Sequence, residues 1–389
     1  MMMRSFGKWL GRVLLVLILA AAVVGFWKRE QIMRLLAVNS LFNAEKIVAN
    51  FSHMNTAFLT TPVSRGDGPT SPLPHGDAWT PPPEVPTWIT DRSVTSLLVM
   101  QNGKLRYEEY FLGTTPDDRR ISWSVAKSYL SSLFGVLVAE GAITSLDDPV
   151  TKYAPKLKNT AYDGASIRNV LNMASGVVFD EDYLDENSDI KRMGRVIALG
   201  GTLDDFTASF TETFAQPGTA WQYVSIDTHV IGMVIRGATG RDIPSLLSEK
   251  IIAPLGLEQA PYYITDGAGV AFVLGGLNLT TRDYARFGQM ILQDGAYGGQ
   301  KVVPADWIAA ATTASAPTGD GKRQYGYQWW APADAHPGEF YGIGVYGQYI
   351  YFDKPRGVLI VTTGADRQFK EPGVDAGNIE IFRKIAESL

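Results

Sequence analysis

A serine and a lysine lie three residues apart in the run Ser124-Val125-Ala126-Lys127. A hydroxyl is a poor nucleophile at its own pKa and needs a base close by. If Ser124 opens a helix, Lys127 lies one turn later on the same face, within reach of the hydroxyl. A lysine becomes a base only when burial or neighbouring positive charge lowers the pKa of its ammonium. The pattern predicts a serine nucleophile paired with a lysine base.

The chain contains three Ser-x-x-Lys strings, which begin at Ser5, Ser124 and Ser188. The first lies before a long apolar run, and the third lies in an acidic, polar stretch without an apolar face to bury Lys191. Only Ser124 lies in a strongly apolar helical pattern, residues 122–140, in which a lysine would be buried. Taken alone, even this string is more typical of an N-capping serine with a surface lysine.

Composition narrows the chemistry further. The 389 residues include no cysteine and four histidines, which excludes disulfides, thiolate nucleophiles and Cys-ligated zinc. No two histidines lie at helical spacing, and the acidic pairs at 147–148 and 204–205 are typical of turns and caps. We therefore expect no metal and no cofactor. A net charge of −5 without basic clusters argues against a nucleic-acid partner.

A second group of candidates follows a tight turn. Gln216-Pro217-Gly218-Thr219 leads to Tyr223-Val224-Ser225, and a helical pattern follows from 227 to 237. In an extended segment Tyr223 and Ser225 point to one side. A tyrosine beside a lysine ammonium can share its proton, and its hydroxyl reaches further than that of a serine. A packed core tyrosine and an N-cap serine remain the alternative interpretation.

A third feature is the glycine-rich run 342–348, Gly-Ile-Gly-Val-Tyr-Gly-Gln, which leads into an apolar strand pattern at 349–352. Glycines at the start of a strand allow another backbone or a ligand to approach closely. Amide N–H groups at this position can therefore meet a substrate carbonyl. By itself, the run favours a simple glycine-rich hairpin.

Strand patterns occur at both ends of the region that must position these residues. Asn102-Gly103 separates the runs 94–100 and 104–111, which predicts a β-hairpin with a type I′ turn. Further strands are expected near the C-terminus, at 325–330, 345–352 and 357–363.

Helical patterns fill the middle of the chain, from about 146 to 257 and again from 280 to 293, where Arg282, Asp283 and Arg286 form a charged face. A final helix is expected from about Asp375. We therefore predict an α/β fold of the α+β type. One antiparallel sheet is completed by both ends of the chain and flanked by helices, with an inserted all-helical lobe.

The N-terminus carries an uninterrupted apolar run, Val13 to Trp27, preceded by Arg4, Lys8 and Arg12. With the residues before it, the run approaches ~17–20 residues, the lower limit for a membrane span. A signal peptide could be cleaved after the small residues 20–22, but the run continues to Trp27, which favours an uncleaved transmembrane anchor. The basic start favours a cytoplasmic N-terminus. The rest of the chain is then expected to be exported to the periplasmic side, anchored to the cytoplasmic membrane by residues about 10–27.

The chain is thus divided into three parts. Residues 1–30 form the anchor or signal segment. Residues 31–90 form a helical and proline-rich connector, because the stretch 60–90 holds eight of the 21 prolines. Residues 91–389 form the catalytic domain, with its helical lobe at about 142–260.

The three features together resemble, in their order and large separations, the serine β-lactamase and penicillin-binding-protein superfamily. The resemblance covers Thr95 to the C-terminus and is strongest for its class C-type branch of esterases and amidases. It includes five further short sequence motifs, at 141–150, 167–176, 254–257, 275–277 and 282–288. The chain is most similar to the 6-aminohexanoate-dimer (nylon-oligomer) hydrolases, which share the Tyr-x-Ser box, the Gly-Ile-Gly run into Gly-Gln and a Gln-Trp-Trp phrase.

This resemblance implies a β-lactamase/transpeptidase-like fold and a role for each candidate. Ser124 would be the nucleophile, Lys127 its base partner and Tyr223 the second acid/base. Ser225 would hold the Lys–Tyr network, and the backbone N–H groups of Ser124 and Val345 would form the oxyanion hole. Which of Lys127 and Tyr223 is the general base stays open, because such a pair titrates as a unit.

The resemblance also implies substrate-binding roles for Tyr183, Trp329, Trp330 and Gly344. The sequence departs from the superfamily at three places. The glycine-rich run 342–348 lacks the Lys-Thr-Gly that β-lactamases carry there. Ser225 replaces the usual asparagine, and Gly194 stands where nylon-oligomer hydrolases carry an acidic residue. The first two departures argue against β-lactam or cell-wall substrates, and the third argues against the nylon oligomer itself.

We therefore expect a serine hydrolase that cleaves a small ester or amide through an acyl-enzyme on Ser124. One alternative on the same fold is a penicillin-recognising D,D-peptidase or β-lactamase. The other is a non-catalytic exported binding protein on the same scaffold. The sequence leaves the physiological substrate, the preference for ester or amide and the oligomeric state open.

Overall fold

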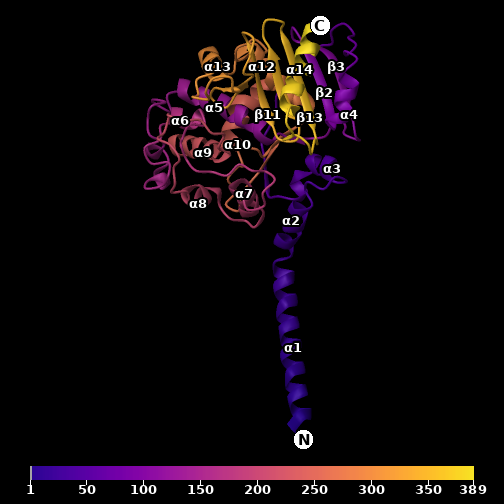
Figure 1. Ribbon diagram of the computed structural model, residues 1–389, viewed down its shortest axis with the longest axis vertical. Coiled ribbons are helices and arrows are strands. Elements are labelled where there is room, and N and C mark those ends of the chain that lie inside the picture. The colour runs from indigo at the N-terminus through magenta and orange to yellow at the C-terminus, as the bar shows by residue number, and fades with distance from the viewer. Residues whose placement is uncertain (1) are drawn as a thin grey trace.

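The N-terminal apolar run forms a helix that stands clear of the rest of the chain (Figure 1). The computed structural model describes the backbone of residues 2–389 and the side chains of residues 9–389. Helix α1 (Met2–Trp27) is followed directly by α2 (Arg29–Asn39). The stretch Trp9–Trp27 of α1 has a mean hydropathy of 2.3 and no buried residue. It therefore has the length and composition of one membrane span.

The main sheet has seven antiparallel strands in the order β3-β2-β13-β12-β11-β10-β9. Its strands are β2 (Val94–Gln101), β3 (Lys104–Tyr110), β9 (Gln324–Tyr325), β10 (Trp330–Ala331), β11 (Glu339–Gly344), β12 (Gln348–Asp353) and β13 (Val358–Gly364). Strand β13 pairs with β2, so both ends of the region build one sheet, as predicted. Asn102 and Gly103 have φ angles of 50° and 76°, which confirms the expected turn between β2 and β3.

Helices cover both faces of this sheet. The strand alternation of β12 sends Ile350 toward α12 (Thr281–Leu292), whereas Tyr349 and Tyr351 contact Phe382 of α14 (Val374–Glu387). Two further helices, α5 (Ala126–Ala139) and α13 (Ala305–Thr312), pack on each other beside α12. The hydrophobic core lies between the sheet and these helices.

The helical lobe is inserted between α5 and α12 (Figure 1). It consists of η3 (Val150–Lys152), η4 (Pro155–Leu157), α6 (Ile167–Leu171), α7 (Asp189–Ala198), α8 (Leu203–Ala208), α9 (Ser225–Thr239), α10 (Ile243–Leu247), η5 (Ser248–Ile252) and α11 (Ala253–Leu255). This confirms the predicted fold class, an antiparallel sheet flanked by helices with a helical lobe.

A smaller sheet has a strand of the N-terminal segment at one edge and the strand that precedes the candidate nucleophile at the other. Its order is β1-β5-β6-β4, with β1 (Thr60–Pro62), β5 (Tyr262–Ile264), β6 (Leu277–Leu279) and β4 (Arg120–Ile121). The short hairpin β7 (Ala296–Tyr297) and β8 (Gln300–Lys301) lies apart from it. Strand β4 leads directly into the turn that carries Ser124.

The stretch predicted as a connector also holds α3 (Ile47–Ser52), η1 (Met54–Thr56) and α4 (Val85–Asp91). Ile47, Phe51, Met54 and Val63 are fully buried against the catalytic part of the chain. The first half of this stretch therefore packs as part of the body, and the domain division at residues 30 and 90 stays a prediction.

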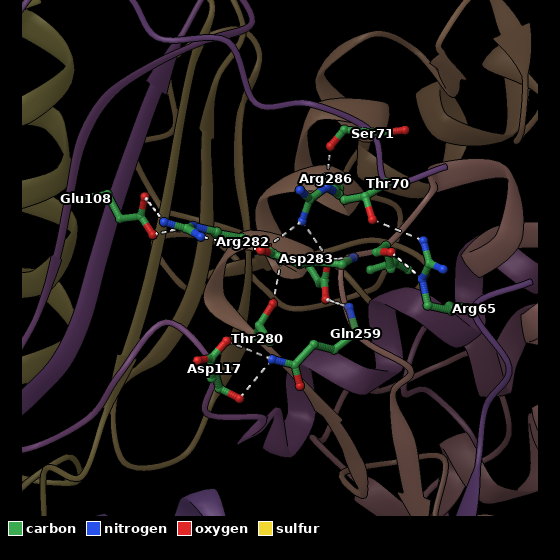
Figure 2. Close-up of polar contacts among 12 residues, drawn as sticks. Arg65, Thr70, Ser71, Glu108, Asp117, Gln259, Thr280, Arg282, Asp283 and Arg286 are labelled. Carbon is green, nitrogen blue, oxygen red and sulfur yellow. Dashed lines mark hydrogen bonds and ion pairs between the residues drawn. The ribbon is translucent and has the colours of Figure 1, made fainter. Parts of the chain in front are cut away.

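A buried polar network fixes the start of α12 (Figure 2). Arg282 forms an ion pair with Glu108 of β3 at 2.7 Å, and Arg286 pairs with Asp283 at 2.7 Å. Arg286 also donates to the carbonyl of Ser71 at 2.9 Å, which holds the proline-rich stretch against the body. The charged face predicted for this helix thus contacts three separate segments: β3, the stretch at Ser71 and residues 258–259.

Candidate active site

Ser124 lies on a sharp turn between β4 and α5, in the short helix η2 (Trp123–Val125). The residue before it, Trp123, has a φ of 42°, a left-handed conformation that bulky side chains rarely adopt. The turn is held on its strand side, because the Ser122 amide donates to the Leu277 carbonyl at 2.8 Å. Ser124 is therefore presented from a fixed and strained backbone.

Lys127 lies in the first turn of α5 and is 1% exposed. Its Nζ donates to Ser124 Oγ at 3.1 Å and to the Leu274 carbonyl at 2.7 Å. Burial lowers the pKa of the Lys127 ammonium to about 7, although the charge of Glu181 acts in the opposite direction. A buried amine with this pKa can accept a proton from Ser124 at neutral pH.

Tyr223 lies in the extended segment that ends where α9 begins, and Lys127 Nζ is 5.4 Å from its ring centre. Burial and the charge of Glu181 raise the pKa of the Tyr223 phenol, whereas hydrogen bonding with Ser124 and Ser225 lowers it in part. The net direction keeps this phenol protonated at neutral pH. Its ring packs against Trp330, with ring centres 5.2 Å apart.

Glu181 is the site residue that the sequence analysis missed. Its carboxylate accepts hydrogen bonds from the Ser225 amide at 2.9 Å, from the Ser225 hydroxyl and from the Tyr183 hydroxyl. Burial raises the pKa of Glu181, and the nearby Lys127 ammonium acts against that rise. The only signal in the sequence was its place two residues before Tyr183, because nothing local indicates that the side chain turns toward α9.

Gly344 allows β11 to lie directly beside the Ser124 turn. A Cβ added at Gly344 would lie 2.5 Å from the Ser122 carbonyl oxygen and 3.0 Å from Trp123 Cβ, so a larger residue would push the strand away. Val345 follows immediately, and its carbonyl accepts a hydrogen bond from the Gln348 side chain at 3.0 Å. Within the described part of the chain, neither the Ser124 nor the Val345 amide donates to a backbone carbonyl outside regular elements. Both amides can therefore serve an oxyanion.

The two predicted tryptophans lie behind the site and not on its wall. Trp329 is 1% exposed and packs among Phe287, Phe340 and Phe352 in the core. Trp330 is buried behind Tyr223, as described above. Gln328, with a φ of 68°, makes the turn that sends both indoles inward.

A cavity of about 550 Å³ opens at Ser124, within the ~300–1,000 Å³ range of small-molecule sites. Ser124, Ser225, Tyr183 and Val345 lie on its wall. Its other walls come mainly from residues 38–58, from α7 and from residues 264–275. Their apolar members are Val38, Leu41, Phe42, Met54, Phe58, Ile190, Met193, Ile197, Ile264, Phe272 and Leu274, and the charged side chains of Glu186, Lys191, Arg195 and Arg367 also line the cavity. Among the described residues, no group of three or more histidine, aspartate or glutamate side chains could hold a metal ion.

Known proteins resemble this chain over most of its length. The profile of the Beta-lactamase family matches residues 89–379. The chain is 30% identical over 328 residues to the 6-aminohexanoate-dimer hydrolase of Paenarthrobacter ureafaciens. The matched region covers 80% of this chain and 83% of that protein. It is 31% identical to Esterase EstB of Burkholderia gladioli over 153 residues, 36% of this chain and 37% of the esterase.

Solved structures share the fold. A Bacillus anthracis protein whose name assigns it to the 6-aminohexanoate-dimer hydrolases superposes with a TM-score of 0.80 at 23% identity, over 89% of this chain and 95% of that one. The octameric penicillin-binding protein homologue from Pyrococcus abyssi superposes with a TM-score of 0.55 at 18% identity, over 77% and 76% of the two chains. At these identities, the likeness supports the architecture alone.

Proposed function

This chain belongs to the beta-lactamase family, and from that premise we propose that it is a serine hydrolase acting through an acyl-enzyme on Ser124. The observation that carries the proposal is the buried Lys127 amine, 3.1 Å from Ser124 Oγ and with a pKa lowered to about 7. The names of the two curated relatives support an amide or an ester as the substrate.

In the first step, Ser124 Oγ attacks the carbonyl carbon of the substrate while its proton passes to the Lys127 amine. The amides of Ser124 and Val345 are placed to stabilise the negative charge on the former carbonyl oxygen. We assign Lys127 as the base and Tyr223 as the proton donor, because Lys127 has the lowered pKa and Tyr223 the raised one.

The bond to the leaving alcohol or amine then breaks as Tyr223 protonates it, and the Lys127 ammonium restores the Tyr223 proton. Glu181 favours the charged form of Lys127 at this stage, since its carboxylate raises the pKa of that ammonium. In the second step, water attacks the acyl carbon and gives a proton to Lys127. Cleavage of the Ser124 Oγ–carbon bond then releases the acid, and the Lys127 ammonium returns its proton to Ser124 Oγ.

A labelled fluorophosphonate tests the assignment on the full chain, because it phosphonylates an activated serine. We expect one labelled peptide, containing Ser124, by mass spectrometry, and no label in Ser124→Ala. Ser128, which donates to the Gln328 carbonyl at 2.9 Å and is buried in α5, supplies a matched control in Ser128→Ala. Label that survives in Ser124→Ala would contradict the proposal, and stable acylation by a labelled penicillin would favour the penicillin-recognising alternative.

We further propose that α1 anchors the chain in the cytoplasmic membrane, with the catalytic part on the periplasmic side. The support is its exposed apolar stretch Trp9–Trp27, with Arg4, Lys8 and Arg12 near its start. The division into an anchor (1–30), a connector (31–90) and a catalytic domain (91–389) is part of this proposal.

A further inference from the structure

The segment that follows the apolar helix forms one wall of the cavity at Ser124. Phe42 stacks on Tyr346, with ring centres 5.1 Å apart and planes 13° from parallel. Phe51 of α3 lies edge-on to Trp123 at 5.4 Å, next to the nucleophile. Residues 38–58 are thereby fixed against the Ser124 turn and contribute lining residues as far along as Phe58.

A second wall, formed by α7, leaves room at Gly194. This glycine lies in the helix and lines the cavity, and a Cβ added there would meet no atom within 4 Å. Glycine within a helix costs about 1 kcal/mol relative to alanine, so helix formation itself does not favour it here. Ile190, Met193 and Ile197 give this helix an apolar surface suited to an aliphatic chain, while Lys191 and Arg195 of the same helix also line the cavity.

The cavity also lies close to the end of the apolar helix. Helix α2 begins two residues after α1 ends, and at 1.5 Å per residue it is roughly 16 Å long. It has no buried residue among those described and exposes Ile32, Met33 (65%) and Leu36. Its last residues, from Val38, already line the cavity, and α2 packs on α7. Leu184 and Leu199, on either side of α7, are exposed as well.

We propose that the substrate is an ester of a long-chain carboxylic acid taken from the membrane, with its aliphatic chain lying between α7 and residues 38–58. This inference rests on the proposed function and names its substrate class. A bond forms between Ser124 Oγ and the acyl carbon as the ester C–O bond breaks, and the alcohol leaves with the proton. Water then releases the long-chain acid and returns a proton to Ser124.

A chain-length series tests the inference on the full chain reconstituted in phosphatidylcholine vesicles. The substrates are p-nitrophenyl acetate, butyrate, octanoate and dodecanoate, together with 1-dodecanoylglycerol. We expect kcat/KM to rise by up to about fourfold per methylene while the chain fills the apolar cavity, and 1-dodecanoylglycerol to be cleaved. Ser124→Ala should abolish every activity.

The variant Gly194→Phe separates binding in the cavity from simple partition of the esters into the vesicle. Its ring would fill the space beside the aliphatic chain, so the ratio of kcat/KM for dodecanoate to that for acetate should fall about tenfold or more. Gly194→Leu should give a smaller fall and covers the case in which the larger ring prevents folding. Gly377→Phe is the matched control, because Gly377 lies in α14 and a Cβ there also meets no atom within 4 Å. It should keep both the activity and the ratio.

Two outcomes would overturn the inference while the proposed function stands. The first is Ser124-dependent hydrolysis of acetate with rates that are flat or fall beyond butyrate. The second is a dodecanoate-to-acetate ratio that does not change in Gly194→Phe and Gly194→Leu. If no ester in the series is cleaved in a Ser124-dependent way, the inference fails, and the proposed function fails with it only if the fluorophosphonate also leaves Ser124 unlabelled.

Discussion

In the proposed mechanism, the buried charges of Lys127 and Glu181 set the working pH of the site. The Lys127 amine must be unprotonated to accept a proton, and its pKa is lowered to about 7. We expect kcat/KM for p-nitrophenyl acetate to fall about tenfold per pH unit below that value and to level off above it. The carboxylate of Glu181 raises the pKa of Lys127, so Glu181→Gln should move this acidic limb of the kcat/KM profile to lower pH.

Asp182→Asn is the control for that pH profile. Asp182 is the next residue, but it is exposed and pairs with Lys370, so its replacement should leave the limb where it is. A limb that moves equally in both variants, or in neither, would contradict the assignment of Lys127 as the base.

Asp227 makes a second prediction at this scale, for stability. Burial raises the pKa of this α9 carboxyl to about 7 from an ordinary value of 3.8, although Tyr162 and Ser175 donate to it. The folded chain thus holds a proton that the unfolded chain releases, so the free energy of unfolding should fall as pH rises from about 4 to 7. The full loss above pH 7 is on the order of 4 kcal/mol.

Asp227→Asn should remove this fall, because the amide accepts the same hydrogen bonds and cannot ionise. Urea unfolding of the full chain in mild detergent at pH 5 and pH 8 measures the difference. Asp320→Asn, at an exposed turn, should retain the pH dependence of the parent chain. An Asp227→Asn chain that still loses stability between these pH values would assign the effect to other groups.

At the scale of elements, the junction around α12 holds together the main sheet, residues 258–259 at the end of the helical lobe, and the proline-rich stretch. Asp283 accepts hydrogen bonds from the amides of Glu258 and Gln259 and pairs with Arg286, which is nearly buried itself. Asp283→Ala would leave these two amides unsatisfied and would leave the buried Arg286 guanidinium only the longer ion pair with Glu258, at 3.5 Å. We expect it to lower the free energy of unfolding by about 3–5 kcal/mol, measured by urea denaturation.

A surface ion pair provides the comparison. Asp205 pairs with Lys156, and both side chains are largely exposed, so Asp205→Ala should change the stability far less than Asp283→Ala. Similar losses in both variants would mean that burial of the α12 network adds nothing.

The elements were predictable where local rules decide them. The β2–β3 hairpin follows from Asn102-Gly103, and the order of strands and helices was enough for the α+β class. The partners of single side chains depend on distant segments. Glu181 turns toward Ser225, 44 residues further along the chain, and Trp329 and Trp330 turn into the interior after Gln328. No periodicity encodes such contacts, so the sequence predicted Ser124, Lys127 and Tyr223 but not the acid behind them.

At the scale of the whole molecule, one continuous stretch runs from the apolar helix to the cavity. Proline content marks residues 60–90 as extended, but the stretch before it packs against the Ser124 turn through Phe42 and Phe51. That role was not visible in the sequence, because the apolar spacing of residues 31–58 predicts helices and says nothing of what they cover. If α1 spans the membrane, this arrangement holds the cavity near the bilayer surface.

The anchor can therefore be tested by its resistance to extraction. A charged residue at the centre of a membrane helix costs about 2.5–3.5 kcal/mol, and near its ends much less. The double variant Leu17→Arg, Ile18→Arg should release the chain from membranes into the carbonate-soluble fraction, whereas Trp27→Arg, at the end of the apolar stretch, should stay in the pellet with the parent chain. Intact mass would show residue 1 or 2 at the N-terminus of the membrane-bound form. A parent chain that carbonate extracts, or one cleaved near residue 22, would exclude α1 as an anchor and leave the cavity to be filled from solution.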